Sequence, residues 1–243
     1  MTDRNRQRVA VITGAAVRVG RHIALALAED GYDIVAGYGR SEEAARSLAD
    51  EVSDLGRRCT LVGSDLRDVA GAEAVAAAAR TNHDRVDLLV NSAASFRRRP
   101  LEEVDADEWD AVMNLNARAS HLLTRALLEP LREARGNVVN ITDLGAFEAW
   151  TEYPHHAVSK AALAHLTRVQ ARSYAPDVRV NGIAPGAVLA PDDWSEEEWQ
   201  RIADRSPLRR AGSPADVVRA VRYLAEADFV TGQILRVDGG RLL

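Results

Sequence analysis

The sequence predicts an α/β protein built on a parallel sheet of about seven strands, with helices on both faces. Short runs rich in Val, Ile and Leu recur along the chain, and several are apolar at consecutive positions, as in strands covered on both sides. Segments with helical character separate them, so strands and helices alternate. The runs are VAVITG (9–14), DIVAGY (33–38), CTLVGSD (59–65), VDLLVNSA (86–93), NVVNIT (137–142), VRVNGIAP (178–185) and QILRVDGG (233–240).

The expected helices lie between these runs. Ser41 is expected to begin one helix and Gly56 to end it. A long helix is expected to end near Pro130, and Pro154 is expected at the start of another. No linker or repeat interrupts the pattern, so residues 1–243 are expected to form one domain. The helical segments are 21–30, 41–56, 70–83, 106–131, 156–174 and 214–225.

Composition narrows the class of protein. The 243 residues are 47% hydrophobic, and 31 basic against 36 acidic side chains give a net charge of −5. This balance argues against a dedicated nucleic-acid binder. The single cysteine, Cys59, forms no internal disulfide, and no apolar run approaches the ~20 residues that span a bilayer. A cytoplasmic protein without a membrane or nucleic-acid partner is expected.

A glycine-rich turn follows the first predicted strand. In VAVITGAAVRVGRHIALALA, five residues separate Gly14 from Gly20, and a helix follows. Glycine lets backbone N–H groups approach a pyrophosphate, and the N-terminus of the helix offers further N–H donors. After the first strand of an α/β pattern, this turn predicts a Rossmann-type, doubly wound fold that binds a dinucleotide.

Several motifs in the same order resemble the short-chain dehydrogenase/reductase family, over Val9 to Gly240. The glycine motif of that family corresponds to residues 13–20, with Arg18 at the position of its middle glycine. The other matches are NSAA (91–94), Asn116, Pro185-Gly186 and VDGG (237–240). The resemblance implies a nicotinamide-dependent oxidoreductase that forms dimers or tetramers.

Four features are similar to the pteridine reductase branch of that family. This branch typically has an arginine in the glycine turn, an Arg-Ser pair after the second strand, a phenylalanine after the fourth strand, and an aspartate where most relatives have a catalytic serine. The matching residues are Arg18, Arg40-Ser41, Phe96 and Asp143.

The choice of nicotinamide cofactor is expected to be NADP(H). An NAD site usually has an acid at the end of the second strand, but DIVAGYGRS places Asp33 at the start of that strand and Arg40 after it. Arg40, with Arg18 nearby, would match a 2′-phosphate. The motifs and the resemblance together assign to the cofactor Thr13, Gly14, Arg18, Val19, Gly20, Tyr38, Arg40, Ser41, Asp65, Leu66, Asn91, Ala93, Lys160, Pro185 and Gly186.

The resemblance assigns four catalytic positions. Lys160 matches the family's lysine, Asn116 the asparagine that supports it, and Asp143 the serine position. His156 stands where the family has its proton-donating tyrosine, four residues before the lysine and on the same helix face. Tyr153 is seven residues before Lys160, so helix geometry does not bring it to that position.

An Asp–His pair beside a nicotinamide is a plausible general acid, since histidine ordinarily titrates much closer to neutral pH than tyrosine. Two other readings stay open: a site without turnover, and chemistry by Asp143 or water. His155 is expected to face solvent, and no metal site is expected because adjacent histidines on a helix point in different directions.

The substrate side is expected to include Phe96, Asp143 and His156, with Phe96 stacking on a planar heterocycle. Arg97, Arg98 and Arg99 have two interpretations: an attractor for an anionic substrate or carrier, and a solvated rim. Trp150 and Tyr153 are expected to form another wall. Residues 186–208 are expected to form a substrate lid, with Ser195 capping a helix and Trp194 and Trp199 supplying apolar surface.

These inferences predict an NADPH-dependent oxidoreductase that transfers a hydride to a planar unsaturated or carbonyl small molecule, a pteridine for example. One alternative is a carbonyl reductase that resembles the 3-oxoacyl-carrier-protein reductases, although their usual serine is absent. The alternative from another class is an NADP(H)-binding sensor or scaffold without turnover, motivated by His156.

Overall fold

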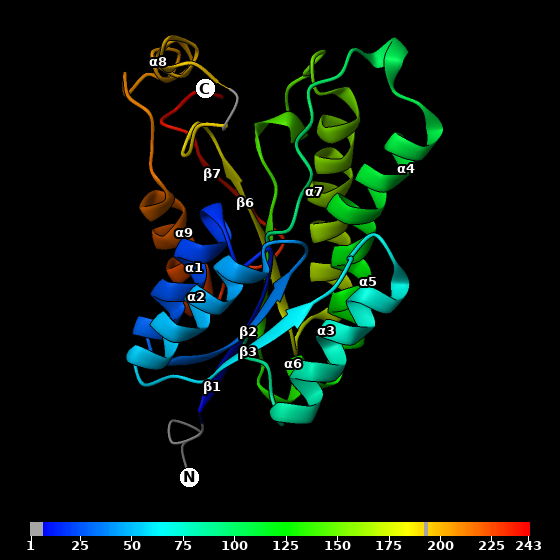
Figure 1. The fold of residues 1–243 in the computed structure, drawn as a ribbon, viewed down its shortest axis with the longest axis vertical. Coiled ribbons are helices and arrows are strands. Elements are labelled where there is room, and N and C mark those ends of the chain that lie inside the picture. The colour runs from blue at the N-terminus through cyan, green and yellow to red at the C-terminus, as the bar shows by residue number, and fades with distance from the viewer. Residues whose placement is uncertain (1–6, 192–193) are drawn as a thin grey trace.

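The computed structural model describes residues 7–191 and 194–243, and it confirms the predicted fold class (Figure 1). All strands are parallel, in the order β3-β2-β1-β4-β5-β6-β7. Since the order runs in opposite directions from β1 and β4, their carboxyl ends diverge into a crevice. The strands are β1 (Arg8–Thr13), β2 (Tyr32–Tyr38), β3 (Cys59–Gly63), β4 (Leu88–Asn91), β5 (Asn137–Ile141), β6 (Arg179–Pro185) and β7 (Ile234–Val237).

Helices cover both faces of the sheet. In Figure 1, α1 (Arg18–Glu29), α2 (Glu42–Asp54) and α9 (Pro214–Glu226) lie on one side, with α3 (Val69–Asn82), α5 (Ala119–Ala126) and α7 (Pro154–Tyr174) on the other. The remaining helical segments are η2 (Leu101–Glu103), α4 (Ala106–Met113), η3 (Asn114–Arg118), α6 (Leu128–Glu133), η4 (Leu144–Ala146) and α8 (Glu196–Ala203). No helix in the described part of the chain is long and apolar enough to cross a membrane.

The consecutive apolar residues of the strands belong to two separate cores. In β1, Ile12 packs in the cluster shared with α1 and α9, whereas its neighbour Val11 packs in the cluster shared with α3 and α5. Burial of each such side chain stabilises the fold by roughly 1.5–3 kcal/mol. This double coverage explains why the strands do not alternate between apolar and polar residues.

The expectation of one long helix over 106–131 is wrong. The chain instead forms α4, a π-helical turn (η3), α5 and α6, and the helix breaks at Leu127. Pro130 lies inside α6, and it has no N–H to donate to the carbonyl of Ala126 four residues earlier. That carbonyl accepts a hydrogen bond from Arg80 Nη1 at 2.7 Å instead.

Other helix boundaries agree with the sequence signals in part. Pro154 is the first residue of α7, and Gly56 follows α2 with a φ of +72°. Ser41 is the N-cap of α2, but its side chain makes no capping hydrogen bond.

Because α1 packs closely against the glycine turn, position 20 has no room for a side chain. A Cβ at this position would lie 2.1 Å from the carbonyl oxygen of Gly14. We expect Gly20→Ala to lower the free energy of unfolding by about 1–3 kcal/mol in urea titrations, because the helix must shift away from the turn. Gly39→Ala is the control, because a Cβ there has no atom within 4 Å and the change should stay within about 0.5 kcal/mol. Equal effects of the two substitutions would contradict this account.

Candidate active site

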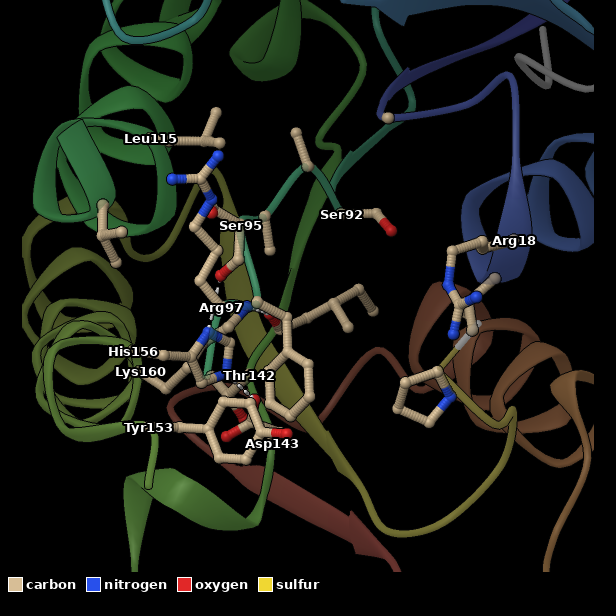
Figure 2. Close-up of a pocket in the computed structure, with 18 of the residues that line it drawn as sticks. Arg18, Ser92, Ser95, Arg97, Leu115, Thr142, Asp143, Tyr153, His156 and Lys160 are labelled. Carbon is tan, nitrogen blue, oxygen red and sulfur yellow. Dashed lines mark hydrogen bonds and ion pairs between the residues drawn. The ribbon is translucent and has the colours of Figure 1, made fainter. Parts of the chain in front are cut away.

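A cleft of about 1400 Å³ opens at the carboxyl ends of the strands. Figure 2 shows its two sides, with Arg18 across the cavity from Asp143, His156 and Lys160. Most residues that the sequence assigns to a cofactor line this cleft, namely Gly14, Arg18, Val19, Gly20, Tyr38, Arg40, Asp65, Leu66, Ala93, Lys160, Pro185 and Gly186.

The glycine turn forms a tight cradle at one side of the cleft. Gly14 has a φ of +65°, and a Cβ on it would lie 3.0 Å from Cα of Ala93. A Cβ on Gly186 would lie 2.9 Å from Cα of Asp238. These close approaches leave backbone and the start of α1 facing the cavity, an arrangement that fits a pyrophosphate.

Three residues assigned to the cofactor do not line the cleft. Thr13 is buried, and its Oγ1 accepts hydrogen bonds from the backbone N–H groups of Ser92 at 3.0 Å and Ala93 at 3.1 Å. Asn91 is also buried, and its Nδ2 donates to Asn140 Oδ1 at 2.8 Å. Thr13 and Asn91 therefore tie the ends of β1, β4 and β5 together. Ser41 lies at the N-terminus of α2, outside the cleft lining.

Basic side chains gather where β2 and β3 end. Arg40 lies at the cleft after β2, and no acid occupies the end of that strand. Arg67, which sequence reasoning missed, binds the carboxylate of Asp65 with Nη2 2.5 Å from Oδ2. Hydrogen bonds from Arg67, and to a smaller extent the charge of Arg40, lower the pKa of Asp65 to about 2. The signal was available, since Arg67 follows the aspartate by two residues.

Arg18 connects the glycine turn to the predicted lid. Its φ of +53° is uncommon for a residue other than glycine. Its Nη2 donates to the carbonyl of Ala190 at 2.9 Å and lies 3.4 Å from that of Leu189. The side chain thus spans from the start of α1 to the segment after β6, the direction that Figure 2 shows.

Asp143, His156 and Lys160 come together opposite the glycine turn. Asp143 follows β5, and α7 carries His156 in its first turn and Lys160 one turn later. His156 Nε2 makes a short contact with Asp143 Oδ2, while Asp143 Oδ1 accepts from the N–H of Gly145 at 2.8 Å. His156 is only 2% exposed, so this pair is shielded from bulk water except through the cleft.

Two neighbours complete this centre. Lys160 Nζ donates to the carbonyl of Ile141 at 2.8 Å. Asn116 projects from the π-helical turn and contacts Ser95, His156 and Ser159. π-helical turns occur frequently at functional sites because the extra residue redirects a side chain.

Burial governs the charge on Lys160. Desolvation lowers the pKa of Lys160 below its ordinary value, and the Asp143 carboxylate opposes this effect in part. A buried lysine in a cleft, with a pKa lowered by desolvation, is typical of a functional site.

Aromatic rings form one wall of the cleft. Phe96 and Tyr153 stack with ring centroids 4.2 Å apart and planes 11° apart. Trp150 lies parallel to the imidazole of His156, with centroids 6.3 Å apart. Tyr153 is the N-cap of α7 and is 7% exposed. It lies in the wall of the cleft, just before the helix that carries His156 and Lys160. The expectation that Trp150 and Tyr153 line the cleft agrees with this arrangement.

The expectation that His155 faces solvent is wrong. Its side chain is fully buried, and burial lowers its pKa. The first turn of α7 is covered by α4, so Nε2 of His155 lies 3.9 Å from Glu108 Oε1. Position within a helix did not reveal this, because the covering helix comes from a distant part of the chain.

The three consecutive arginines form ion pairs with nearby acids. Arg97 lies 3.7 Å and Arg99 3.2 Å from Glu108, and Arg98 pairs with Glu152. These pairs hold residues 97–99 along the rim of the cleft. Glu108 lies on the following helix, α4, and Glu152 follows Arg98 by 54 residues, so sequence alone did not identify these partners.

Residues of the segment 186–208, the predicted lid, line the cleft, although Asp192 and Asp193 lie outside the described residues. Ser195 begins α8 with a capping box, in which Glu198 N–H donates to its Oγ at 3.2 Å and its own N–H donates to Glu198 Oε2 at 2.8 Å. Trp194 and Trp199 line the cleft. Across residues 7–191 and 194–243, the side chains form no group of three or more His, Cys, Asp or Glu suited to a metal ion.

Comparison with known proteins places this geometry in a family. The family model described as enoyl-(acyl carrier protein) reductase matches residues 14–241. The chain is 33% identical over 245 residues to 2-dehydro-3-deoxy-D-gluconate 5-dehydrogenase of Escherichia coli K12, covering 97% of this chain and 95% of the relative. The chain belongs to the short-chain dehydrogenase/reductase family.

Further relatives support this family assignment. A 3-oxoacyl-[acyl-carrier-protein] reductase of Staphylococcus aureus Mu50 is 29% identical over 237 residues, covering 95% of this chain and 96% of that protein. The crystal structure of an acetoin dehydrogenase from Enterobacter cloacae matches with a TM-score of 0.89 at 29% identity, covering 98% of this chain and 96% of that chain. Short-chain dehydrogenases/reductases are oxidoreductases that use a nicotinamide cofactor and act on small molecules.

The buried ammonium of Lys160 makes stability depend on pH. Its folded pKa lies below the unfolded value of 10.5, so between the two values only the unfolded state binds the proton. We therefore expect the free energy of unfolding to rise with pH in that window, by up to about 1.4 kcal/mol per pH unit, relative to Lys160→Met. Urea titrations of both proteins from neutral pH toward pH 10 measure the difference. Parallel stability curves would contradict a lowered pKa of Lys160 in the folded protein.

Proposed function

We propose that this protein is an NADPH-dependent reductase of planar unsaturated or carbonyl small molecules, with a dihydropterin as the first candidate substrate. The observation that carries this proposal is the buried Asp143–His156 pair beside Lys160, in a cleft that also holds the glycine cradle. When bound, the reduced nicotinamide would supply a hydride, and the chain itself would supply the proton.

Support for NADP(H) comes from the end of β2. Arg40 follows this strand, and Asp33, the acid of the strand, lies buried at its start in an ion pair with Arg58 at 2.7 Å. Arg40 would contact a 2′-phosphate, and Arg67, which is hydrogen-bonded to Asp65, would add positive charge in the same cleft. A ribose hydroxyl would lack its usual acidic acceptor. Gly14 and Gly20 would hold the pyrophosphate, and Lys160, Pro185 and Gly186 the nicotinamide end.

His156 would act as the proton donor in the position where the family carries tyrosine. An imidazole that is hydrogen-bonded to a carboxylate is held in a fixed orientation, as a general acid requires. Asp143 would orient the ring and stabilise its charged form, while Lys160 would stabilise negative charge that develops nearby. The lid, 186–208, would exclude water from the reacting groups.

The aromatic wall supports a flat substrate. One face of Phe96 is covered by Tyr153, yet the ring is still 43% exposed. A planar ring system would stack on this surface and lie beside Asp143 and His156. The same four features of sequence that resemble the pteridine reductases, Arg18, Arg40-Ser41, Phe96 and Asp143, support a pteridine as the substrate.

Two alternatives have their own support. The similarity to a 3-oxoacyl-[acyl-carrier-protein] reductase favours a carbonyl substrate. Asp143, at the position where that family usually has a serine, argues against it. The histidine at the tyrosine position favours a sensor that binds NADP(H) without turnover. A homodimer or homotetramer in the cytoplasm is part of the proposal, by resemblance to the family.

Cofactor choice is tested by substituting Arg40. We expect Arg40→Ala to weaken NADPH binding at least tenfold and to leave NADH binding unchanged, because only NADPH carries the 2′-phosphate. Fluorescence titration of the bound cofactor measures both affinities. Arg46→Ala on the outer part of α2 is the control, since Arg46 pairs with Glu42 at 2.7 Å away from the cleft lining. Equal losses for both cofactors would refute a 2′-phosphate contact.

The role of His156 is tested by truncation. We expect His156→Ala to lower kcat for NADPH oxidation with a dihydropterin by about 10²–10⁴-fold and to leave NADPH affinity unchanged, because only proton transfer is lost. His22→Ala on the exposed side of α1 is the matched control. Unchanged turnover in His156→Ala would exclude this histidine as the acid, and a wild-type protein that binds NADPH but reduces nothing in a broad carbonyl and pterin panel would favour the sensor.

A further inference from the structure

Both ring nitrogens of His156 are engaged by acceptors. Nδ1 lies 2.7 Å from the carbonyl oxygen of Ser95, and Nε2 contacts Asp143 Oδ2. A carbonyl oxygen only accepts hydrogen bonds, so Nδ1 must carry a hydrogen. One further proton then remains for the Nε2–Oδ2 contact, on the imidazole or on the carboxyl group.

Asn116 also approaches His156, but it cannot be a donor to Nδ1. The N–H of Ser95 donates to Asn116 Oδ1 at 2.8 Å, and this fixes which end of the amide is oxygen. The two hydrogens on Nδ2 have acceptors in Ser159 Oγ at 2.9 Å and Ser95 O at 3.2 Å. The 3.3 Å separation of Asn116 Nδ2 from His156 Nδ1 is therefore an approach of two donors.

We infer that Asn116 is a positioning residue that fixes the tautomer of His156 by clamping the backbone of Ser95. A single amide holds both the N–H and the C=O of Ser95, so the acceptor for Nδ1 is immobilised. Ser159 closes the network, because its Oγ donates to the carbonyl of His156 at 2.6 Å. The catalytic meaning of this clamp rests on the proposed function.

Burial makes the network rigid. Asn116 is 1% exposed and Ser159 is fully buried, so water does not compete for these hydrogen bonds. The π-helical turn brings Asn116 inward, while Leu115 next to it lines the cleft. A buried amide left without partners would be costly, which keeps Asn116 in this orientation.

The clamp determines which proton the site can give up. With Nδ1–H held on Ser95, the transferable proton lies between Nε2 and Asp143 Oδ2. The titratable groups that face His156 are Asp143 after β5 and, on α7, Lys160 and His155. The loop after β4 and the π-helical turn contribute the neutral groups of Ser95, Phe96 and Asn116.

The test is a ¹⁵N NMR measurement of the histidine ring nitrogens from about pH 6 to 9. The signals of His156 are identified as those that are absent from the spectrum of His156→Ala. In wild type, Nδ1 of His156 should carry hydrogen throughout. In Asn116→Ala, the tautomer protonated only at Nε2 should appear, because Nδ1 loses its fixed acceptor. Asn116→Asp should keep Nδ1 protonated, because a carboxylate beside it accepts its hydrogen.

Two further variants separate positioning from folding. Asn137→Ala removes another buried amide, which donates to Leu224 O at 2.9 Å on the far side of the sheet, and it should destabilise the protein without changing the His156 signals. Should Asn116→Ala fail to fold, Ser159→Ala loosens the same clamp and should give the same tautomer change in smaller proportion.

The inference is overturned by an unprotonated Nδ1 in wild type, or by His156 signals in Asn116→Ala and Ser159→Ala that match those in Asn137→Ala. The NMR readout needs no turnover. A wild-type protein that reduces no substrate while showing the predicted tautomers would refute the proposed function and leave the clamp intact.

Discussion

The hydrogen bond between Asp143 and His156 is the interaction on which the candidate site depends. Asp143 is held by its position after β5 and by the N–H of Gly145, and His156 by the first turn of α7. A charged imidazole as buried as that of His156 would be costly without a carboxylate beside it. Each supplies the partner that the other needs, and the cleft gives both access to a substrate.

The parallel sheet makes this pairing possible. Because all strands end at the same edge, side chains from the ends of β4 and β5 and from the start of α7 converge, although they are far apart in the sequence. Buried polar contacts hold these ends in register, among them the hydrogen bond from Asn91 to Asn140 and the one from Asn140 Nδ2 to Thr167 Oγ1 at 2.9 Å. The site is thus built on rigid elements, as preorganised chemistry requires.

Much of this arrangement could be predicted from the sequence, because some local patterns indicate the burial or close packing of the same residues. Consecutive apolar residues indicated strands covered on both faces, and Gly14 and Gly20 indicated a close approach of backbone to the cleft. The convergence of Asp143, His156 and Lys160 followed from motif order. The burial of His155 could not be predicted, because the side chains that cover it come from α4. Likewise, the hydrogen bond from Arg80 that satisfies the carbonyl of Ala126 at the break could not be predicted, because Arg80 reaches it from another helix.

We propose that the Asp143–His156 pair supplies the proton for the reduction. The most direct test is NADPH oxidation by the purified wild-type protein with a dihydropterin, followed from about pH 5 to 9. We expect turnover to fall as pH rises through a single transition, when the shared proton is lost. Turnover that stays constant to pH 9 would contradict it, because such a profile indicates an acid that keeps its proton well above the histidine range.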